Sequence, residues 1–458
     1  MIVCKFGGTS VQDAAAIERV ASIIKKRLAE RPVVVASAMG KTTNGLLLAA
    51  RTAADGKRQE ALDQLSVLKD RHLKEAQKLG VGIGQDDEVG DAIFSQFKEM
   101  GNIVKGLSIL GELTPRSLDA IASFGERLST TILTKALRDR GMPARLMDAR
   151  KCVITDDQFT RAAPLFDLTE AAIQEYLRPV LKAGEVPVLQ GFIGSTRNGI
   201  TTTIGRGGSD YSAAIIGAAL DAYDIQIWTD VDGIMTCDPR MVPAARRVRV
   251  ISFDEAAELA YFGAKVLHPA TILPAVQKKI PVHVLNSYKP DQEGTLITDE
   301  APPCENPVKS IAFKSGISVI NIASTRMLMA YGFLKKIFEI FDHFRVPVDV
   351  VSTSEVSVSL TLDETSTLWD VVTELKKIGE VKVEGGKAIV CCVGDSLRSI
   401  AGVPHLVFSA VQEVTIHMIS QGASAINVTF VIDEDQLPRV VRGLHDVFFQ
   451  KTDPMIFE

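Results

Sequence analysis

The sequence has no excess of positive charge. Its 458 residues include 51 lysines and arginines against 56 aspartates and glutamates, which gives a formal net charge of −5. Nucleic-acid-binding proteins usually carry a basic excess or a basic stripe, so we expect no nucleic-acid partner. The sequence also has no apolar run near the ~18 residues of a membrane helix and no basic and apolar leader, so we expect neither a membrane partner nor a signal peptide.

Cysteine is also scarce. The six cysteines are scattered and form no C-x-x-C pair: Cys4, Cys152, Cys237, Cys304, Cys391 and Cys392. They are too few for a disulfide framework in a chain of this length, and isolated cysteines usually pack as small apolar side chains. We therefore expect reduced thiols and a cytoplasmic protein.

Three familiar nucleotide and metal motifs are missing. No G-x-G-x-x-G follows a predicted strand, which leaves a nicotinamide site without support. Gly40-Lys41-Thr42 resembles the end of a Walker A loop, but Val35 stands where that loop needs its first glycine. Residues 230–233 begin like a calcium loop and lack the rest of its ligand spacing. Any nucleotide site must therefore be sought in other loops.

The first 300 residues alternate short apolar runs with helical patterns. Strands are predicted over residues 2–5, 32–37, 187–193 and 225–229, and helices over residues 14–31, 59–79, 91–105 and 118–140. This alternation predicts an α/β fold with a mostly parallel sheet sandwiched by helices. Ligands of such sheets bind outside the carboxyl ends of the strands, so the loops that follow the strands are the candidate sites.

Near residue 300 the pattern changes. Residues 299–307 hold three prolines and three acidic residues and predict a linker. Beyond it a β-α-β-β-α-β order occurs twice, which predicts two ferredoxin-like units. The predicted domains are 1–300, a linker and strand contributed to the second small unit at 301–316, and small units at 317–386 and 387–458. The first strand of the second unit can alternatively come from residues 308–314.

The loop after the first strand, KFGGTS at residues 5–10, fits a phosphate. Its two glycines let backbone N–H groups approach a phosphate, and the next helix offers its positive N-terminus. Lys5 would neutralise charge that builds during group transfer. The alternative is a tight turn in which Ser10 caps the helix.

A second loop of the same kind is Gly205-Arg206-Gly207-Gly208-Ser209-Asp210, before a helix over residues 211–220. Arg206 can bind a carboxylate or phosphate through two hydrogen bonds. The alternative is a capped helix start in which Asp210 complements the helix dipole. Two such loops in one α/β domain indicate two anionic ligands, or one long one.

Three further segments contain polar residues in unusual places. Residues 228–240 follow a strand and are rich in acids and turn formers, which suits a nucleotide loop or a solvated acidic turn. Glu126 interrupts a core-like helix, where a carboxylate is costly unless it binds a ligand or pairs with an arginine. Lys265 and His268 lie at a helix end, and we do not assign His268 to catalysis because a lone histidine there usually caps or packs.

Taken together, these motifs resemble those of the aspartate kinases of the amino acid kinase family, which carry two C-terminal ACT domains. The matching motifs, in chain order, are KFGGTS at 5–10, SAMGKTTN at 37–44, SFGERLS at 123–129, GRGGSDYSAA at 205–214, WTDVDGIMTCDPR at 228–240, FGAKVLHP at 262–269 and STSEVSVSLTL at 352–362. The similarity covers essentially the whole chain and is strongest to the monofunctional, lysine-sensitive type.

The resemblance implies transfer of phosphate from MgATP to the β-carboxylate of L-aspartate, giving 4-phospho-L-aspartate and ADP. This is the first step toward lysine, threonine and methionine. The acceptor carboxylate has a pKa near ~4 and is ionised at neutral pH, so the chemistry needs cations and alignment rather than a general base. Mg²⁺ would be bound with ATP, and the resemblance adds no metal-binding residues of the protein. A homodimer or homotetramer through the ACT domains is also implied.

The resemblance also assigns residues to the catalytic site. The catalytic residues are Lys5, Gly8 and Asp210, and the aspartate-binding residues are Thr43, Glu126, Arg206 and Ser209. The ATP-binding residues are Lys5, Gly7, Gly8, Thr9, Ser10, Thr229, Asp230, Met235, Arg240, Lys265 and Val266. Met235 replaces the tyrosine that is usual at its position. Arg206 would hold a substrate carboxylate, and Glu126 would bind the ammonium group.

A lysine-effector site is implied in the first ACT domain. Its residues are Met327, Gly332, Phe333, Val348, Asp349, Thr353, Ser354, Glu355 and Val356. Asp349 and Glu355 suit an ammonium group, although a solvated strand end is the alternative. Pro347 replaces a serine and removes a backbone N–H, so threonine stays open as the effector. Other amino acid kinases, of acetylglutamate or glutamate, and a non-catalytic amino-acid sensor are the alternative functions.

Overall fold

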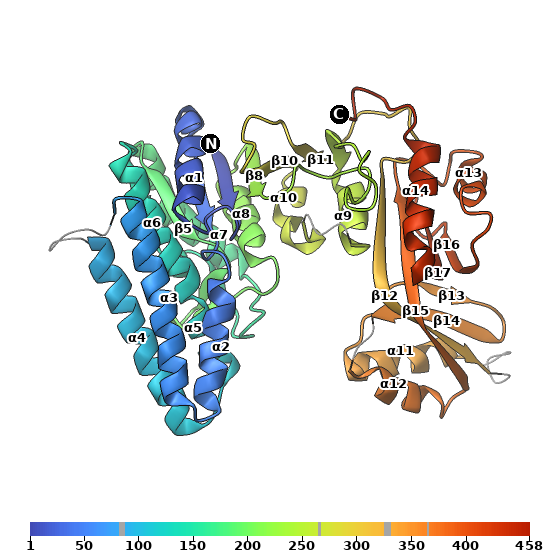
Figure 1. Ribbon diagram of the computed structural model, residues 1–458, viewed down its shortest axis with the longest axis horizontal. Coiled ribbons are helices and arrows are strands. Elements are labelled where there is room, and N and C mark those ends of the chain that lie inside the picture. Colours follow the sequence, from blue (N-terminus) through green and yellow to red (C-terminus); the bar gives the residue numbers. More distant parts are fainter. Residues whose placement is uncertain (82–87, 264–266, 325–330, 364–365) are drawn as a thin grey trace. The chain divides into compact units, whose positions relative to one another are not determined.

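The computed structural model describes residues 1–81, 88–263, 267–324, 331–363 and 366–458 (Figure 1). The chain forms two compact units. The N-terminal unit combines Met1–Gly233 with Val266–Glu300, and the C-terminal unit combines Ile234–Lys265 with Ala301–Glu458. The sequence pattern predicts one domain over residues 1–300, whereas the structure groups Ile234–Lys265 with the C-terminal unit.

Backbone hydrogen bonds explain this grouping. The N–H of Ile311 donates to the carbonyl of Thr236 at 2.7 Å, and that of Arg249 donates to the carbonyl of Ile456 at 2.7 Å. A fully buried ion pair of 3.0 Å joins Lys309 to Glu255. Such long-range pairings cannot be read from a local sequence pattern, which explains why the sequence predicted a single boundary.

The N-terminal unit is built on a sheet with the strand order β3-β5-β2-β1-β8-β10-β11. The strands are β1 (Ile2–Phe6), β2 (Val33–Ala36), β3 (Ala144–Leu146), β5 (Val186–Gln190), β8 (Asp224–Thr229), β10 (Val282–Asn286) and β11 (Thr295–Thr298). All neighbours in this order pair in parallel except β10 and β11, so the predicted mostly parallel sheet is confirmed. A small second sheet contains β4 (Ile154–Thr155), β6 (Ile193–Thr196) and β7 (Thr201–Thr203).

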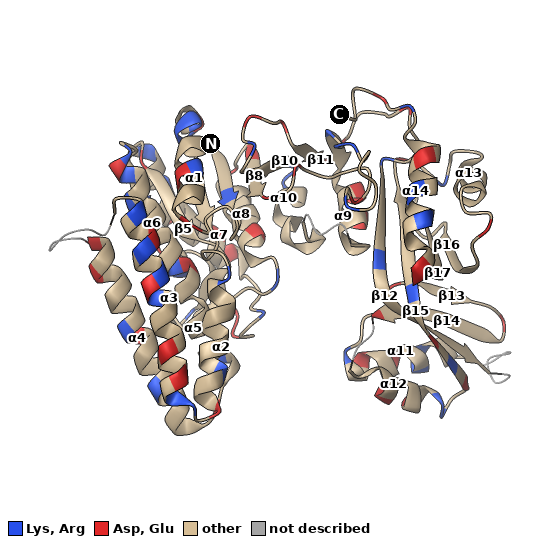
Figure 2. Cartoon of the chain, in the orientation of Figure 1, with Lys and Arg blue, Asp and Glu red and all other residues tan. Residues whose placement is uncertain are grey.

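Helices cover both faces of this sheet (Figure 1). One face carries α1 (Ala14–Lys26) and α6 (Phe124–Asp139), and the other carries α7 (Phe166–Lys182), α8 (Gly208–Ala219) and α10 (Leu273–Gln277). An outer layer over α6 consists of α2 (Thr42–Ala54), α3 (Arg58–Lys78) and α4 (Glu88–Leu110). Charges of both signs alternate along α3 (Figure 2), as expected for a helix with a solvated face.

Several helices differ from the sequence prediction, and α7 and α10, like α2, lie where none was predicted. The structure adds α2, in a region where no helix was predicted, and it divides the predicted helix 118–140 into α5 (Pro115–Ala122) and α6. The break at Ser123 matters for the site because it places Glu126 in the first turn of a new helix.

The C-terminal unit contains a six-stranded sheet with the order β13-β14-β12-β15-β17-β16. Its strands are β12 (Ser310–Ala323), β13 (Val351–Thr353), β14 (Ser357–Asp363), β15 (Glu380–Val393), β16 (Ile416–Gln421) and β17 (Asn427–Asp433). Its helices are α9 (Phe253–Tyr261), α11 (Phe333–Phe344), α12 (Leu368–Leu375), α13 (Val403–Ser409) and α14 (Leu437–Phe448), and β9 (Val250–Ser252) precedes α9. The two predicted ferredoxin-like units are present.

The two ferredoxin-like units share the strands β12 and β15. The first half of β12, from Ser310 to Lys314, pairs with the second half of β15, and its second half pairs with the first half of β15. The second unit is therefore completed by residues that precede the first. These residues take the place of its fourth strand, beside Ala388–Val393, rather than of its first strand.

None of the helices in the described part of the chain is both long enough and apolar enough to cross a membrane.

Candidate active site

The loops after four parallel strands meet at the carboxyl edge of the N-terminal sheet. The N–H of Gly7, after β1, donates to the carbonyl of Trp228 in β8 at 3.1 Å. The N–H of Ser37, after β2, donates to Phe6 at 3.0 Å, and the N–H of Gly191, after β5, donates to Ala36 at 2.9 Å. These bonds fix the loops against one another at the edge where α/β sheets bind ligands.

A pocket of about 320 Å³ opens at this edge. It is lined by all of the predicted catalytic and aspartate-binding residues: Lys5, Gly8, Thr43, Glu126, Arg206, Ser209 and Asp210. They come from β1, α2, α6 and the start of α8, up to 205 positions apart in the sequence. The structure therefore brings the two predicted anion loops together in one place.

Lys5 and Asp210 form an ion pair inside the pocket. The Lys5 Nζ lies 2.6 Å from Asp210 Oδ1, and the two side chains are 10% and 15% exposed. Asp210 stands in the first turn of α8, where a carboxylate complements the helix dipole. The pair holds the ammonium group of Lys5 at the pocket wall.

Glu126 is a buried carboxyl of the pocket with a single hydrogen bond to the protein on one of its oxygens. Its Oε1 accepts a hydrogen bond of 3.2 Å from the N–H of Ala38, whereas its buried Oε2 has no hydrogen-bond partner among the described residues. Burial raises the pKa of the Glu126 carboxyl to about 8. An unpaired buried carboxylate oxygen at a pocket wall suits a cationic ligand group, because an ammonium ion would restore its charged form.

Glycine allows the backbone to line the pocket closely. A Cβ at Gly8 would lie 3.2 Å from the carbonyl oxygen of Ala38 and 3.3 Å from that of Gly40. Gly207 caps α8 with a φ of 69°, which a residue with a side chain rarely adopts. Ser37, which donates to Ser209 Oγ at 2.9 Å, also lines the pocket and was not assigned a role from the sequence, although it begins the SAMGKTTN motif.

The predicted nucleotide residues are more dispersed. Gly7 and Thr9 lie in the turn after β1, and Ser10 is buried there, where its hydroxyl meets the Trp228 carbonyl at 3.2 Å and Ser287 Oγ at 2.9 Å. The Ser10 hydroxyl is thus bonded within the protein. Thr229 ends β8, and its hydroxyl donates to Asp230 at 3.2 Å.

Two predicted nucleotide residues, Met235 and Arg240, belong to the C-terminal unit. Arg240 is 89% exposed and pairs with Asp238 at 2.6 Å. Lys265 and Val266 lie outside the described residues. Among the residues that the structure does describe, no group of three or more His, Cys, Asp and Glu side chains could hold a metal ion.

The predicted effector residues that the structure describes lie within the first ferredoxin-like unit. Gly332 caps α11 in a left-handed conformation and Phe333 is buried behind it. Val348 precedes β13, where its carbonyl accepts from Tyr261 of α9 at 3.4 Å. Thr353, Ser354, Glu355 and Val356 form the exposed connection from β13 to β14. Met327 lies outside the described residues.

Asp349 already has a cationic partner. The Lys314 Nζ, on β12, lies 3.0 and 2.9 Å from the two carboxylate oxygens of Asp349 and 2.9 Å from Asp363 Oδ1. The Asp349 side chain is only 4% exposed. Lys314 was not identified from the sequence, because only the register of β12 in the sheet places it beside Asp349.

Comparison with known proteins agrees with this geometry. Residues 1–286 match the amino acid kinase family and residues 390–448 match the ACT domain. The chain is 41% identical to aspartokinase 2 of Arabidopsis thaliana, over 99% of this chain and 85% of the relative. It is 38% identical to the lysine-sensitive aspartokinase 3 of Escherichia coli, over 98% of this chain and 99% of the relative.

The chain belongs to the aspartokinases. The resemblance found in the motifs is thereby confirmed. Among solved aspartokinases, E. coli aspartokinase III in complex with aspartate and ADP superposes with a TM-score of 0.85, at 37% identity, over 98% of this chain and 100% of the other. The same enzyme in complex with lysine and aspartate gives a TM-score of 0.83, at 37% identity and the same coverage.

Proposed function

We propose that the candidate active site transfers the γ-phosphoryl group of MgATP to the β-carboxylate of L-aspartate, giving 4-phospho-L-aspartate and ADP. One observation carries this proposal. A single pocket combines a lysine held at its wall, the N-terminus of α8, an arginine at its rim and a buried carboxylate oxygen that has no hydrogen-bond partner among the described residues. These groups complement phosphate, carboxylate and ammonium, which together make up the two substrates.

The aspartate-binding residues divide the substrate between them. The Oε2 of Glu126 accepts the α-ammonium group, and Arg206, which is exposed at the start of α8, holds the α-carboxylate through its guanidinium fork. Thr43 and Ser209 line the space between them. With the two α-substituents fixed, the β-carboxylate at the other end of the amino acid faces the phosphoryl group, and positioning of this kind is a large part of catalysis.

The phosphoryl group is stabilised by Lys5, by the backbone at Gly8 and by the N-terminus of α8. The acceptor carboxylate is already ionised, so no side chain has to remove a proton from it. Lys5, oriented by Asp210, neutralises the charge that builds on the oxygens in the transition state. Mg²⁺ enters as part of the MgATP substrate, which is consistent with its preference for phosphate oxygens and water.

The remaining nucleotide contacts are proposed for Gly7, Thr9 and Ser10 after β1, and for Thr229 and Asp230 after β8. Met235, Arg240, Lys265 and Val266 complete the set by similarity of motif. Ser10 contributes through its backbone, because its hydroxyl is bonded to Trp228 and Ser287.

We also propose that lysine inhibits the enzyme through the first ACT domain. One of the superposed E. coli structures is a complex with lysine and aspartate in the T-state. Within the C-terminal unit, β12 connects the predicted effector and nucleotide residues. Ser310 Oγ donates to the carbonyl of Met235 at 2.7 Å, and Lys314, on the same strand, holds Asp349. A ligand that displaces Lys314 from Asp349 would therefore act on the strand that anchors Met235.

A homodimer or homotetramer through the ACT domains is part of the same proposal, since ACT domains support regulatory assembly. We further propose a cytoplasmic location. The six cysteines are free thiols, and five of them are buried, as expected in a reducing compartment.

The decisive experiment measures aspartyl hydroxamate formation with ATP, with and without lysine. Coupled ADP detection with aspartate, glutamate and acetylglutamate tests the alternative substrates in parallel. We expect turnover with aspartate alone, and a decrease when lysine is added at subsaturating aspartate. Equal turnover of another acceptor would contradict the substrate assignment, and unchanged activity across a lysine titration would contradict the effector. Threonine is titrated beside lysine to identify the effector.

A further inference from the structure

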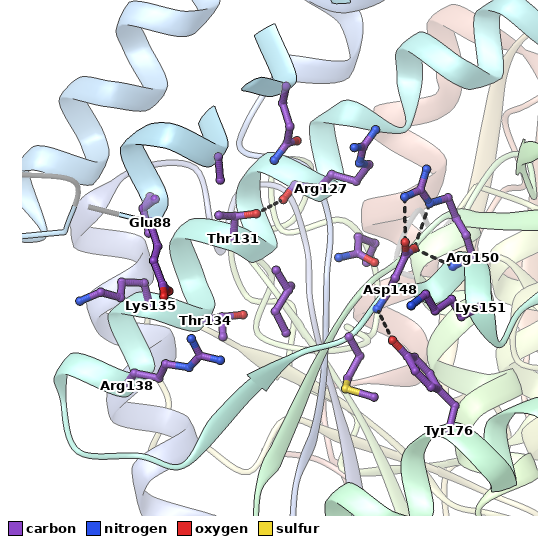
Figure 3. Close-up of a pocket in the computed structure, with 16 residues that line it drawn as sticks. Glu88, Arg127, Thr131, Thr134, Lys135, Arg138, Asp148, Arg150, Lys151 and Tyr176 are labelled. Atoms are coloured by element: carbon purple, nitrogen blue, oxygen red, sulfur yellow. Dashed lines mark hydrogen bonds and ion pairs between the residues drawn. The ribbon is translucent and has the colours of Figure 1, made fainter. Parts of the chain in front are cut away.

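A second pocket lies in the N-terminal unit, between α6 and α4 on one side and the short helix η2 (Ala149–Lys151) and α7 on the other (Figure 3). Its volume is about 530 Å³, larger than the about 320 Å³ of the candidate active site. None of its lining residues belongs to the catalytic, nucleotide or effector sets. We call it the α4–α6 pocket.

Cationic side chains dominate the lining of the α4–α6 pocket. The lining contains five cations and two carboxylates: Arg127, Lys135, Arg138, Arg150 and Lys151 against Glu88 and Asp148. Lys135 is also paired with Asp139, outside the lining, at 2.5 Å. Figure 3 shows that the first three enter from α6 and that Arg150 and Lys151 enter from the opposite wall. Cations that converge from two walls form a site for an anion rather than a solvated charged face.

The carboxylates of the lining only partly compensate this charge. Asp148 accepts two hydrogen bonds from the guanidinium of Arg150, at 2.7 and 2.9 Å. Arg127 lies over the ring of Phe124 at 4.4 Å, is 19% exposed, and forms an ion pair of 3.5 Å with the exposed Glu99. Burial and the neighbouring Arg150 lower the pKa of Arg127. A guanidinium in this position would be stabilised by a further anion.

The rest of the pocket contains hydrogen-bonded polar groups and apolar side chains. Gln190, which is 4% exposed, accepts from the N–H of Ala149 at 2.9 Å and donates to Thr130 at 2.9 Å. The hydroxyl of Tyr176 accepts from the N–H of Asp148 at 3.3 Å, so its own proton can be donated to a ligand. Leu146 and Met147 add apolar surface. A fixed polar floor with some apolar wall is typical of small-molecule sites.

We propose that the α4–α6 pocket binds a small metabolite that carries at least two anionic groups, phosphates or carboxylates. Two groups are needed because the cations stand on two opposite walls, and arginine and lysine together bind such oxygens by forked and single contacts. The volume lies within the range of about 300 to 1,000 Å³ that small-molecule sites occupy.

The α4–α6 pocket and the candidate active site share the first turn of α6. Glu126 and Arg127 are consecutive in the first turn of α6, yet one lines the candidate active site and the other lines the α4–α6 pocket. Thr130, which receives the hydrogen bond of Gln190, itself donates to the carbonyl of Glu126 at 2.8 Å. An anion bound here contacts the helical turn that carries the proposed aspartate-binding carboxylate.

Isothermal titration calorimetry on the full chain tests this site. Pyrophosphate and citrate are the two probes, one for phosphate groups and one for carboxylates, and each is titrated with and without saturating ADP and aspartate. The pocket variant is Lys135→Ala/Lys151→Ala, and Lys151→Glu is a second variant. The matched control is Lys105→Ala/Lys182→Ala, which removes the same charge from exposed lysines of α4 and α7 outside the lining.

We expect at least one probe to bind with one site per chain, whether or not ADP and aspartate are present. Affinity should fall at least ~10-fold in the pocket variants and change less than ~2-fold in the control, which corresponds to the loss of charge-assisted contacts. No binding of either probe, binding that ADP and aspartate abolish, or equal weakening in the control would each overturn the proposal. Because the readout is binding, these outcomes are independent of the proposed kinase reaction.

Discussion

Each unit contains a carboxylate that the motifs assign to an ammonium group, and the two carboxylates have opposite surroundings. In the N-terminal unit, Glu126 Oε2 is buried without a hydrogen-bond partner among the described residues, and burial raises the pKa of its carboxyl to about 8. In the C-terminal unit, both oxygens of Asp349 are held by Lys314. The first site is prepared to accept a cation, whereas the second must exchange an internal cation for an external one.

This difference suits the two proposed roles. A substrate site that must bind in every turnover gains from a group that only the substrate satisfies, because no internal contact has to be broken first. An effector site needs two states with different contacts, since a ligand shifts an equilibrium only by its differential affinity for those states. The exchange of Lys314 for a ligand ammonium would supply such a difference.

The largest expected effect is at Lys5, the cation that pairs with Asp210 in the candidate active site. Lys5→Ala removes the ammonium group 2.6 Å from Asp210 and should lower kcat at least ~10²-fold, the scale of losing one electrostatic partner of the transition state. Steady-state hydroxamate assays measure this, with Lys25→Ala on the exposed side of α1 as the control of equal charge. Near-normal turnover in a folded Lys5→Ala protein would reject the assigned role.

The second effect concerns Glu126 itself. Glu126→Gln should raise the KM for aspartate by ~10- to 100-fold, because a charge-assisted bond to the ammonium group is lost, with a smaller change in kcat. In the wild type, the affinity for aspartate should decrease as the pH falls below about 8, where the carboxyl becomes protonated in the free enzyme. Glu60→Gln on α3 is the exposed control, and an unchanged KM in Glu126→Gln would remove Glu126 from the aspartate site.

The raised pKa of Glu126 also predicts how the free energy of unfolding depends on pH. Its pKa is about 8 in the folded protein against an ordinary value of 4.5, so between these values the folded state keeps a proton that the unfolded state has lost. The free energy of unfolding should therefore decrease as the pH rises from about 4.5 to about 8, and Glu126→Gln should remove this decrease. Denaturant titrations of the two proteins across this range measure the difference, and parallel profiles would contradict the raised pKa. Lys5, Arg206 and Asp210 line the same pocket and are unchanged between the two proteins.

The third effect concerns Asp349, the carboxylate that is paired with Lys314. Asp349→Asn removes the charge that lysine would have to bind, so the lysine concentration for half-inhibition should rise by ~10-fold or more. Asp370→Asn on the exposed face of α12 is the matched control. Inhibition by lysine that is equally sensitive in both variants would place the effector elsewhere.

The contrast also separates what a sequence can predict from what it cannot. Lys5 and Asp210 were found because they lie in glycine loops, and the loops after parallel strands meet at one edge of a sheet. Glu126 was found because a carboxylate interrupts a core-like helix. The partner of Asp349 was missed because Lys314 lies 35 positions away and reaches it only through the pairing of β12 with β14. Strand order and register depend on the whole fold, and no local spacing encodes them.

Two other features of the structure also depend on contacts that no local spacing encodes. The segment Ile234–Lys265 follows the catalytic motifs in sequence, yet its hydrogen bonds run to β12 and to the chain terminus, and it belongs to the C-terminal unit. The α4–α6 pocket combines Arg127 with Arg150, which lie in separate helices and have no common motif. Both features depend on contacts between segments that are remote in sequence.

The smallest expected effect is that of removing Lys314, the cation that distinguishes Asp349 from Glu126. Lys314→Met removes the cation that pairs with Asp349 and Asp363, so lysine no longer has to displace a competitor. Lysine should then inhibit at about threefold lower concentration, since partly exposed ion pairs contribute up to ~1 kcal/mol. Lysine should also raise the melting temperature more in Lys314→Met than in the wild type, because binding restores the lost pair. Lys376→Met is the exposed control. Weaker inhibition in Lys314→Met than in this control would show that Lys314 builds the effector site instead of competing for it, and the two carboxylates would then no longer differ in the proposed way.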